Sequence, residues 1–292
     1  MPIALHHVTQ YLYDRHVRLG PQIIRLRPAP HYRGRVISYA MKVEPASGVV
    51  RWMQDAFSNE IAEVSFPDAC ELFRISVDLV IDDLIIHPFG TLLHPDACDV
   101  PPVYDSPLIK ALAPYRHLEP AGALLQQYLG TIDRSTRRAT DFLLAINQRV
   151  HSDIRYLVRR EHGVQTPEQT LHKQSGSCRD SGWLLVQLLR HCGFAARFVS
   201  GYLMQPSPPA QTAKAPSVSH ADQIELHAWC EAYVPDIGWI GLDPTSGLLA
   251  GAPHVPVACA PLPAAAAPVE GNVDTCEVDF SYRLAISSLP SP

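Results

Sequence analysis

The chain contains no long hydrophobic run. No apolar stretch approaches the roughly 18 residues that a membrane-spanning helix requires, which argues against a helical membrane protein. The first twenty residues, MPIALHHVTQYLYDRHVRLG, carry charges and histidines where a secretory signal has an apolar core. We therefore expect no signal peptide and no membrane partner.

Cysteine and basic residues are also scarce. The seven cysteines are scattered over 292 residues, at positions 70, 98, 178, 192, 230, 259 and 276. An odd and sparse set is not a disulfide framework, so we expect a reducing cytoplasm. Lys and Arg number 24 against 29 Asp and Glu, a formal net charge of −5 with no basic block, which argues against a nucleic-acid partner. Aromatic residues make up only 8%, and nothing marks a carbohydrate or nucleotide pocket.

Apolar residues are plentiful, at 47% of the chain, which suits a folded protein with a sizeable core. The N-terminal part indicates β-strands, because FRISVDLVID (73–82) alternates with the period of a half-buried strand. QIIRLRP (22–28) and YAMKVEP (39–45) indicate two more strands, each ended by proline. We predict an antiparallel β-rich N-terminal domain over residues 1–95, and a proline-rich linker candidate at 83–107.

A helical pattern occupies about residues 107–192, and strands return after Gly193 in FAARFVSGYLM, QIELHAWCEAYV and GWIGLD. Residues 205–222, rich in proline and serine, read as a long surface loop. We therefore predict a core of helices and antiparallel strands over residues 96–250.

The C-terminal segment, residues 251–292, divides into two parts. Residues 251–271 read as an alanine- and proline-rich crossing, and CEVDFSYRLAI (276–286) reads as a final strand. The predicted fold class is α+β.

Cys178 lies in GSCRDSGWLL (176–185), at the predicted start of a helix that Gly193 ends. In a first helical turn, free N–H groups and the positive end of the helix dipole favour the thiolate, which is the reactive form of cysteine. The same N–H groups can hold an oxyanion. A buried, inert thiol is the alternative until a partner base is found.

His227 is the candidate base. Alternation along ELHAWCEAYV (225–234) places His227 on the strand face opposite Ala228 and Cys230. Asp243 ends the next strand, in LDPTSG, where an ordinary turn aspartate is the alternative.

The register of these two strands decides whether His227 and Asp243 meet. If they pair antiparallel, the two side chains share a face when Tyr233 lies opposite Trp239, or where a bulge restores that register. A cysteine nucleophile needs a base, and the base needs an orienting group. Cys178, His227 and Asp243 supply these roles in chain order.

Two segments resemble the transglutaminase-like superfamily of cysteine enzymes. They are SGSCRDSGWLLVQLLRHCGFAARFVSGYL (175–203) and HAWCEAYVPDIGWIGLDPTSG (227–247). The resemblance covers about residues 140–250, and the β-rich N-terminal part is similar to the domain that accompanies bacterial members. It implies a papain-like α+β core with Cys178 as nucleophile, His227 as base and Asp243 as orienter.

The chain departs from the family pattern next to the nucleophile. Arg179 stands where many bacterial members have a different residue, and it either favours the thiolate and acidic substrates or points into solvent. The second oxyanion donor is not identified, and Tyr156 and Gln174 are the candidates that the resemblance suggests. The calcium sites of animal members are not carried over, since no acidic cluster matches them.

The triad predicts attack on a carboxamide or peptide carbonyl of a protein or peptide substrate, with a thioester intermediate and no cofactor. Hydrolysis is favoured, because water competes with any amine unless the site excludes it. Transfer to an amine, as in a true protein-glutamine transglutaminase, is the alternative. The substrate and the oligomeric state stay open.

Two other classes compete with this interpretation. One is a zinc-binding protein, whose candidate ligands would be Cys178, Cys192, His227 and Cys230. Their spacing in the sequence is not that of a zinc knuckle, and the alternation of a strand places His227 and Cys230 on opposite faces. A binding module that keeps the fold without turnover is the other class, and an intact triad argues against it.

Overall fold

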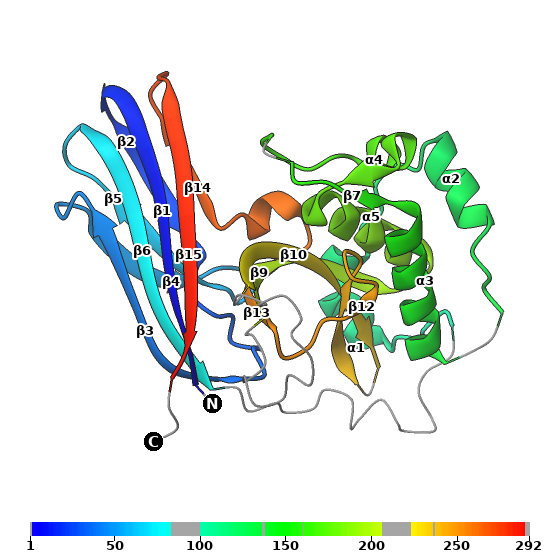
Figure 1. Ribbon diagram of the computed structural model, residues 1–292. Helices are drawn as coiled ribbons and strands as arrows, with labels where there is room; N and C mark the ends of the chain where they lie inside the picture. The colour runs from blue at the N-terminus through cyan, green and yellow to red at the C-terminus, as the bar shows by residue number, and fades with distance from the viewer. Residues whose placement is uncertain are drawn as a thin grey trace, which may run out of the picture.

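Most of the strands in the computed structural model belong to two sheets built from the N-terminal part of the chain (Figure 1). The model describes residues 2–82, 100–135, 138–159, 161–205, 223–235 and 237–289. The N-terminal strands are β1 (Pro2–Val17), β2 (Leu19–Ile24), β3 (Arg35–Glu44), β4 (Val49–Gln54), β5 (Glu60–Ser65) and β6 (Cys70–Asp82). The predicted strands in 22–28, 39–45 and 73–82 correspond to β2, β3 and β6.

Alternation along β6 explains how this half is held together. Phe73, Ile75, Val77 and Leu79 are at most 1% exposed, while the residues between them are more accessible. A strand with one apolar face buries that face against a second layer. The core formed there also takes in Tyr202 and Val255 from the rest of the chain, so the N-terminal sheets pack directly on the second half of the molecule.

The C-terminal strands return to these N-terminal sheets. The strand β15 (Val278–Ser288), red in Figure 1, pairs antiparallel with β1, and β14 (Val269–Val273) pairs with β2. The sheet orders are β15-β1-β6-β3 and β14-β2-β5-β4. The final strand predicted within 276–286 is therefore present, and it completes a sheet that the first residues of the chain begin.

A third sheet belongs to the second half of the chain. Its order is β12-β11-β10-β9-β13, with β9 (Ala195–Gln205), β10 (Gln223–Val234), β11 (Gly238–Asp243), β12 (Leu248–Leu249) and β13 (His254–Ala260). The reading of 251–271 as a plain crossing was wrong for β13, which pairs with β9. Proline hid this strand: Pro256 lies opposite Gly201, where the register shifts, a place at which a strand tolerates proline.

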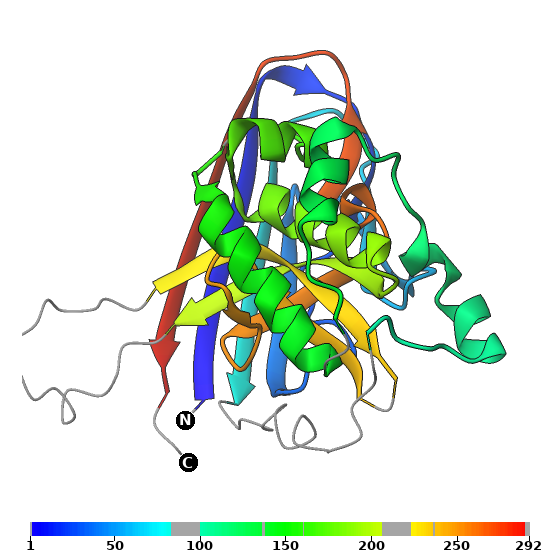
Figure 2. The ribbon, with the colours of Figure 1, turned by 90° about the vertical axis from the view of Figure 1, so that its right-hand side faces the viewer.

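Helices cover the third sheet on the side away from the N-terminal sheets (Figures 1 and 2). These helical elements are α1 (Ser106–Ala111), the 3-10 turn η2 (Ala113–Arg116), α2 (Ala123–Gly130), α3 (Ala139–Asp153), α4 (Pro167–Lys173) and α5 (Cys178–His191). A second 3-10 turn, η4 (Pro263–Ala266), is orange in Figure 1 and lies between the N-terminal sheets and these helices. The short strands β7 (Arg155–Tyr156) and β8 (Ser175–Gly176) form a parallel pair. In the described part of the chain, no helix is both long enough and apolar enough to cross a membrane.

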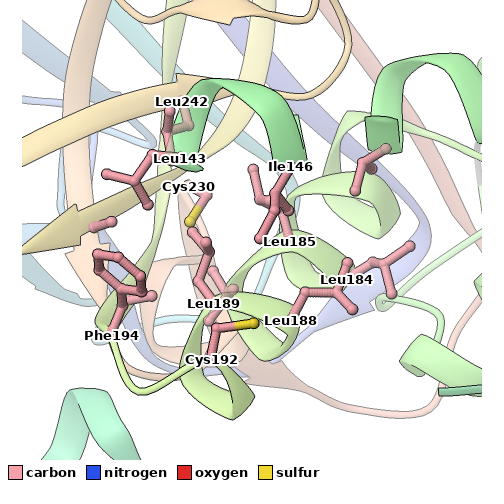
Figure 3. Close-up of a cluster of buried hydrophobic side chains, with 14 of the residues drawn as sticks. Leu143, Ile146, Leu184, Leu185, Leu188, Leu189, Cys192, Phe194, Cys230 and Leu242 are labelled. Atoms are coloured by element: carbon pink, nitrogen blue, oxygen red, sulfur yellow. The ribbon is translucent and has the colours of Figure 1, made fainter. Parts of the chain in front are cut away.

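The core between these helices and the sheet fixes the position of α5. Leu184, Leu185, Leu188 and Leu189 are fully buried and face apolar residues of α3, β10 and β11 (Figure 3). Each such side chain contributes about 1.5–3 kcal/mol relative to exposure. The first turn of α5 is therefore held against β10 by a rigid apolar contact.

Candidate active site

Cys178 is the first residue of α5, as the sequence predicted. Ser177 caps the helix and forms a reciprocal capping box with Asp180. The side chain of Cys178 is half-buried, whereas the neighbouring Ser177 and Asp180 are buried. The thiol therefore lies at the positive end of the helix dipole with partial access to solvent, the setting that favours a reactive cysteine.

Asp180 holds the nucleophile turn in place. Its Oδ2 accepts hydrogen bonds from Ser177 N and Oγ at 2.8 Å and from Arg159 Nε at 2.9 Å, and its Oδ1 accepts one from Gln165 N at 2.7 Å. Burial raises the pKa of Asp180, but these donors outweigh it and the net shift is downward. Gly176 allows this close packing, because a Cβ there would lie 2.7 Å from the Asp180 Cβ. We conclude that an ionised Asp180 fixes the start of α5.

The register of β10 and β11 is the one that the sequence required for a His–Asp pair. Tyr233 lies opposite Trp239, and Cys230 lies opposite Leu242. His227 and Asp243 then approach, with 3.2 Å between His227 Nε2 and Asp243 Oδ1. Both side chains are buried, at 3% and 1% exposure of the residue. Among the described residues, neither ring nitrogen of His227 has a hydrogen-bond partner of good geometry, so the contact is an ion pair.

The charges around His227 favour its protonated form. Burial lowers the pKa of His227, but Asp243, Cys178 and Glu225 raise it more, to about 12. Burial likewise raises the pKa of Asp243, and His227 with His254 bring it below its usual range. Since the Nε2 atom of His227 faces Asp243, its Nδ1 atom is the nitrogen available to the Cys178 thiol. Glu225 Oε1 also lies 3.2 Å from His227 Nδ1.

His254 is a fourth side chain of the site, and no pattern in the sequence marked it. Its Nε2 lies 3.3 Å from Asp243 Oδ2, while its Nδ1 accepts a hydrogen bond from Gly251 N at 3.2 Å. An acceptor at Nδ1 means that the proton of the neutral ring is on Nε2 and is donated to the carboxylate. The Asp243 carboxylate thus lies between the imidazoles of His227 and His254. It also accepts a hydrogen bond from Thr245 N, at 2.9 Å from Asp243 Oδ1.

Arg179 is directed away from the nucleophile. Its Nη2 donates to the carbonyls of Arg159 and Glu161 at 3.0 and 3.1 Å. A guanidinium that donates to these two carbonyls supports the backbone at Arg159 and Glu161, and these contacts do not favour a role in stabilising the Cys178 thiolate.

The two oxyanion candidates lie on different parts of the fold. Gln174 ends α4 in a left-handed conformation, with φ at 47°, and is exposed. Tyr156 pairs with Gly176 in the β7–β8 ladder, and Gly176 lies two residues before Cys178 in the sequence. Burial raises the pKa of Tyr156 to about 12, and Cys178 and Glu225 act in the same direction. The phenol is therefore a protonated donor next to the site.

The cysteines that the sequence offered as zinc ligands do not form a metal site with Cys178. Cys192 and Cys230 are buried in the apolar core (Figure 3). Within the described ranges, the groups with metal-ligand geometry are His227, Asp243 and His254, and separately His31, Glu231 and Cys259. The predicted surface loop at 205–222 lies almost wholly outside the described residues, as does most of the linker candidate at 83–107.

Family models match the two halves of the chain in order. The bacterial transglutaminase-like N-terminal region matches residues 3–82, and the core of the transglutaminase-like superfamily matches residues 126–244, which include all three predicted triad residues. The chain belongs to the transglutaminase-like superfamily. The domain limits at 95 and 250 stay a prediction.

Relatives of this transglutaminase-like chain occur in mycobacteria and bacilli. "Uncharacterized protein Rv2569c" of Mycobacterium tuberculosis is 23% identical over 270 residues, which cover 83% of this chain and 78% of that protein. "Uncharacterized protein Mb2599c" of Mycobacterium bovis matches to the same extent. "Uncharacterized protein YebA" of Bacillus subtilis is 35% identical over 72 residues, which cover 25% of this chain and 10% of that protein.

One solved structure shares the whole fold. A protein of Cytophaga hutchinsonii, provisionally described as a cysteine protease, matches with a TM-score of 0.71 at 16% identity, over 100% of this chain and 92% of that one. The fold is therefore α+β, with a papain-like, transglutaminase-like core preceded by an antiparallel β-rich N-terminal part.

Proposed function

We propose that this chain is a cysteine-dependent acyl-transfer enzyme that cleaves amide or isopeptide bonds of a protein or peptide substrate. The observation that carries the proposal is the 3.2 Å approach of Asp243 to His227, beside a half-buried thiol at a helix start. Nucleophile, base and orienter are the groups that thioester chemistry needs.

In the first half-reaction, the Cys178 thiolate attacks the carbonyl carbon and a C–S bond forms. N–H groups at the start of α5 hold the resulting oxyanion, and Tyr156 is the better placed of the two candidates for a second donor. When the tetrahedral intermediate collapses, the C–N bond breaks and His227 gives its proton to the leaving amine or ammonia.

In the second half-reaction, His227 removes a proton from the acceptor, which attacks the thioester and releases Cys178. We favour water as the acceptor, because water outcompetes amines at any site that does not exclude it. Asp243 holds the imidazole in the orientation that both half-reactions use, and His254 holds Asp243. His254 is therefore a positioning residue in this scheme.

The test is to incubate the protein with a glutamine-containing peptide and an isopeptide-linked peptide, with and without a primary amine, and to weigh the products. Hydrolysis predicts an acid product whether or not the amine is present. An amine adduct as the main product would assign a true transglutaminase instead. If neither peptide changes, while Cys178→Ala still binds them, the chain is a binding module on the same fold.

We also propose the cytoplasm as the location, because a reactive Cys178 must stay reduced. The six described cysteines are free thiols. The location stays a prediction. It is tested by comparing thiol labelling of the protein in intact cells with its labelling in isolated cell fractions.

A further inference from the structure

A second group of a cysteine, a histidine and a carboxylate lies where the N-terminal part of the chain meets the third sheet. It consists of His31, in the segment between β2 and β3, Glu231 on β10 and Cys259 on β13. We call it the sheet site. Its three ligand atoms lie within 4.8 Å of one another, and none of them takes part in the chemistry proposed above.

Two of the three spacings between these atoms match those of ligands around one metal ion. Cys259 Sγ lies 3.4 Å from His31 Nε2, and His31 Nε2 lies 3.5 Å from Glu231 Oε1. Ligand atoms at about 2.0–2.3 Å from a tetrahedral zinc ion lie about 3.3–3.6 Å apart. A thiolate with an imidazole is a donor set that selects zinc over magnesium or calcium.

Surrounding contacts hold Glu231 and Cys259 in place without using their ligand atoms. Arg197 contacts Glu231 Oε2 through both Nε, at 2.8 Å, and Nη2, at 2.6 Å. The other oxygen of Glu231, Oε1, is therefore the one that faces His31. The Asn59 side chain forms two hydrogen bonds with the backbone of Cys259. Its Oδ1 accepts one from Cys259 N at 2.8 Å, and its Nδ2 donates one to Cys259 O at 3.0 Å. Supporting contacts of this kind are what orient the ligands of a metal site.

Access to the sheet site comes from one side. The His31 side chain is 36% exposed, whereas Cys259 is 1% exposed. Ala29 N donates to the Pro256 carbonyl at 2.7 Å, which ties the segment that carries His31 to the strand that carries Cys259. His31 is therefore the ligand that an ion from solvent would meet first.

We propose that His31, Glu231 and Cys259 bind one zinc ion that links the N-terminal part of the chain to the third sheet. Binding replaces the thiol proton of Cys259, which leaves as H⁺ to solvent, by a zinc–sulfur bond. Three protein ligands leave a fourth position for a water molecule on the exposed side of His31.

The test uses the full chain carrying Cys178→Ser, so that the active-site thiol cannot bind metal. After dialysis against zinc and removal of the excess, elemental analysis should find one zinc per chain. His31→Ala should weaken zinc binding at least about tenfold. His16→Ala, an exposed histidine on β1, and His254→Ala should retain the zinc.

Cobalt provides a second readout that identifies the sulfur. The cobalt-loaded protein should show a thiolate-to-cobalt charge-transfer band, and Cys259→Ser should remove it. Because His31 is partly exposed, His31→Ala should fold even if Cys259→Ser does not. The proposal is overturned if the parent chain binds no zinc, if His31→Ala keeps it, or if His254→Ala is the variant that loses it. None of these outcomes depends on acyl-transfer activity.

Discussion

Within the described residues, a cysteine, a histidine and a carboxylate come together in two places, and the two groups differ in their surroundings. In the helix site, made of Cys178, His227 and Asp243, the sulfur is half-buried at the start of α5. In the sheet site, Cys259 lies within β13, and burial raises the pKa of its thiol well above the usual value.

The histidines are arranged in the opposite way. His227 is buried beside Asp243, whereas His31 is partly exposed beside a glutamate whose other oxygen is taken by Arg197. A free helix end and an accessible sulfur favour nucleophilic chemistry. A buried sulfur among fixed ligands favours a bound ion. We therefore expect the two thiols to differ in chemistry, although each lies beside a histidine and a carboxylate.

The largest expected effect comes from removing the sulfur of the helix site. Cys178→Ala should lower amide hydrolysis by at least about 10⁴-fold, because the covalent step is lost. Cys192→Ala, which removes a buried thiol in the apolar core, is the control. Alkylation at neutral pH, mapped by mass spectrometry, should modify Cys178 first and Cys259 only on unfolding. Equal modification of both would remove the distinction between the two sites.

Asp243→Asn should have the next largest effect, a loss of about 10³-fold in kcat/KM, because the imidazole loses its orienting carboxylate. Asparagine can keep the hydrogen bond from Thr245 N, so the turn should be preserved. The measurement is a kinetic assay with a melting curve as the folding control. Activity within about threefold of the parent chain would show that Asp243 is only a turn residue.

Glu231→Gln should weaken the fold by about 3 kcal/mol at neutral pH, roughly 10²-fold in the unfolding equilibrium, because it leaves the buried Arg197 without its carboxylate partner. Burial raises the pKa of Glu231, but Arg197 and His31 lower it to about 2 from 4.5. A carboxylate with a lowered pKa stabilises the folded state above pH 4.5, and this contribution is lost as the pH falls toward 2.

The difference in unfolding free energy between the parent chain and Glu231→Gln should therefore shrink between pH 7 and pH 3. Denaturant titrations without added metal measure it. A difference that stays constant over this range would mean that the ionised state of Glu231 does not stabilise the sheet site.

His254→Ala should have the smallest effect, about tenfold in kcat/KM, because one hydrogen bond to the Asp243 carboxylate is lost. His254→Gln can still donate an N–H, and partial rescue would support a positioning role. The variants should change kcat more than KM. A loss of stability without a change in kcat would make His254 a structural residue only.

The sequence was sufficient to place the residues of the helix site on their helix and strands because its signals are local, whereas their catalytic roles stay a prediction. The position of Cys178 followed from the small residues before α5 and the apolar face after it. The pairing of Tyr233 with Trp239 followed from the requirement that His227 and Asp243 share a face. Each of these inferences spans one element or one turn, where periodicity and loop length carry the information.

The residues that were missed depend on contacts between distant segments. His254 lies on a strand whose pattern Pro256 interrupts, so alternation did not reveal it. His31 and Cys259 are 228 positions apart, and they meet only because β13 joins the third sheet beside the N-terminal half. No local pattern in a single sequence encodes a contact of this range.

Thioester formation on Cys178 is tested most directly by the intact mass of the protein during turnover of an amide substrate whose acyl group remains bound. We predict a transient mass increase equal to the acyl group, mapped to Cys178 and absent in Cys178→Ala. Turnover of the substrate with full activity in Cys178→Ala, or an acyl group found on a different residue, would contradict it.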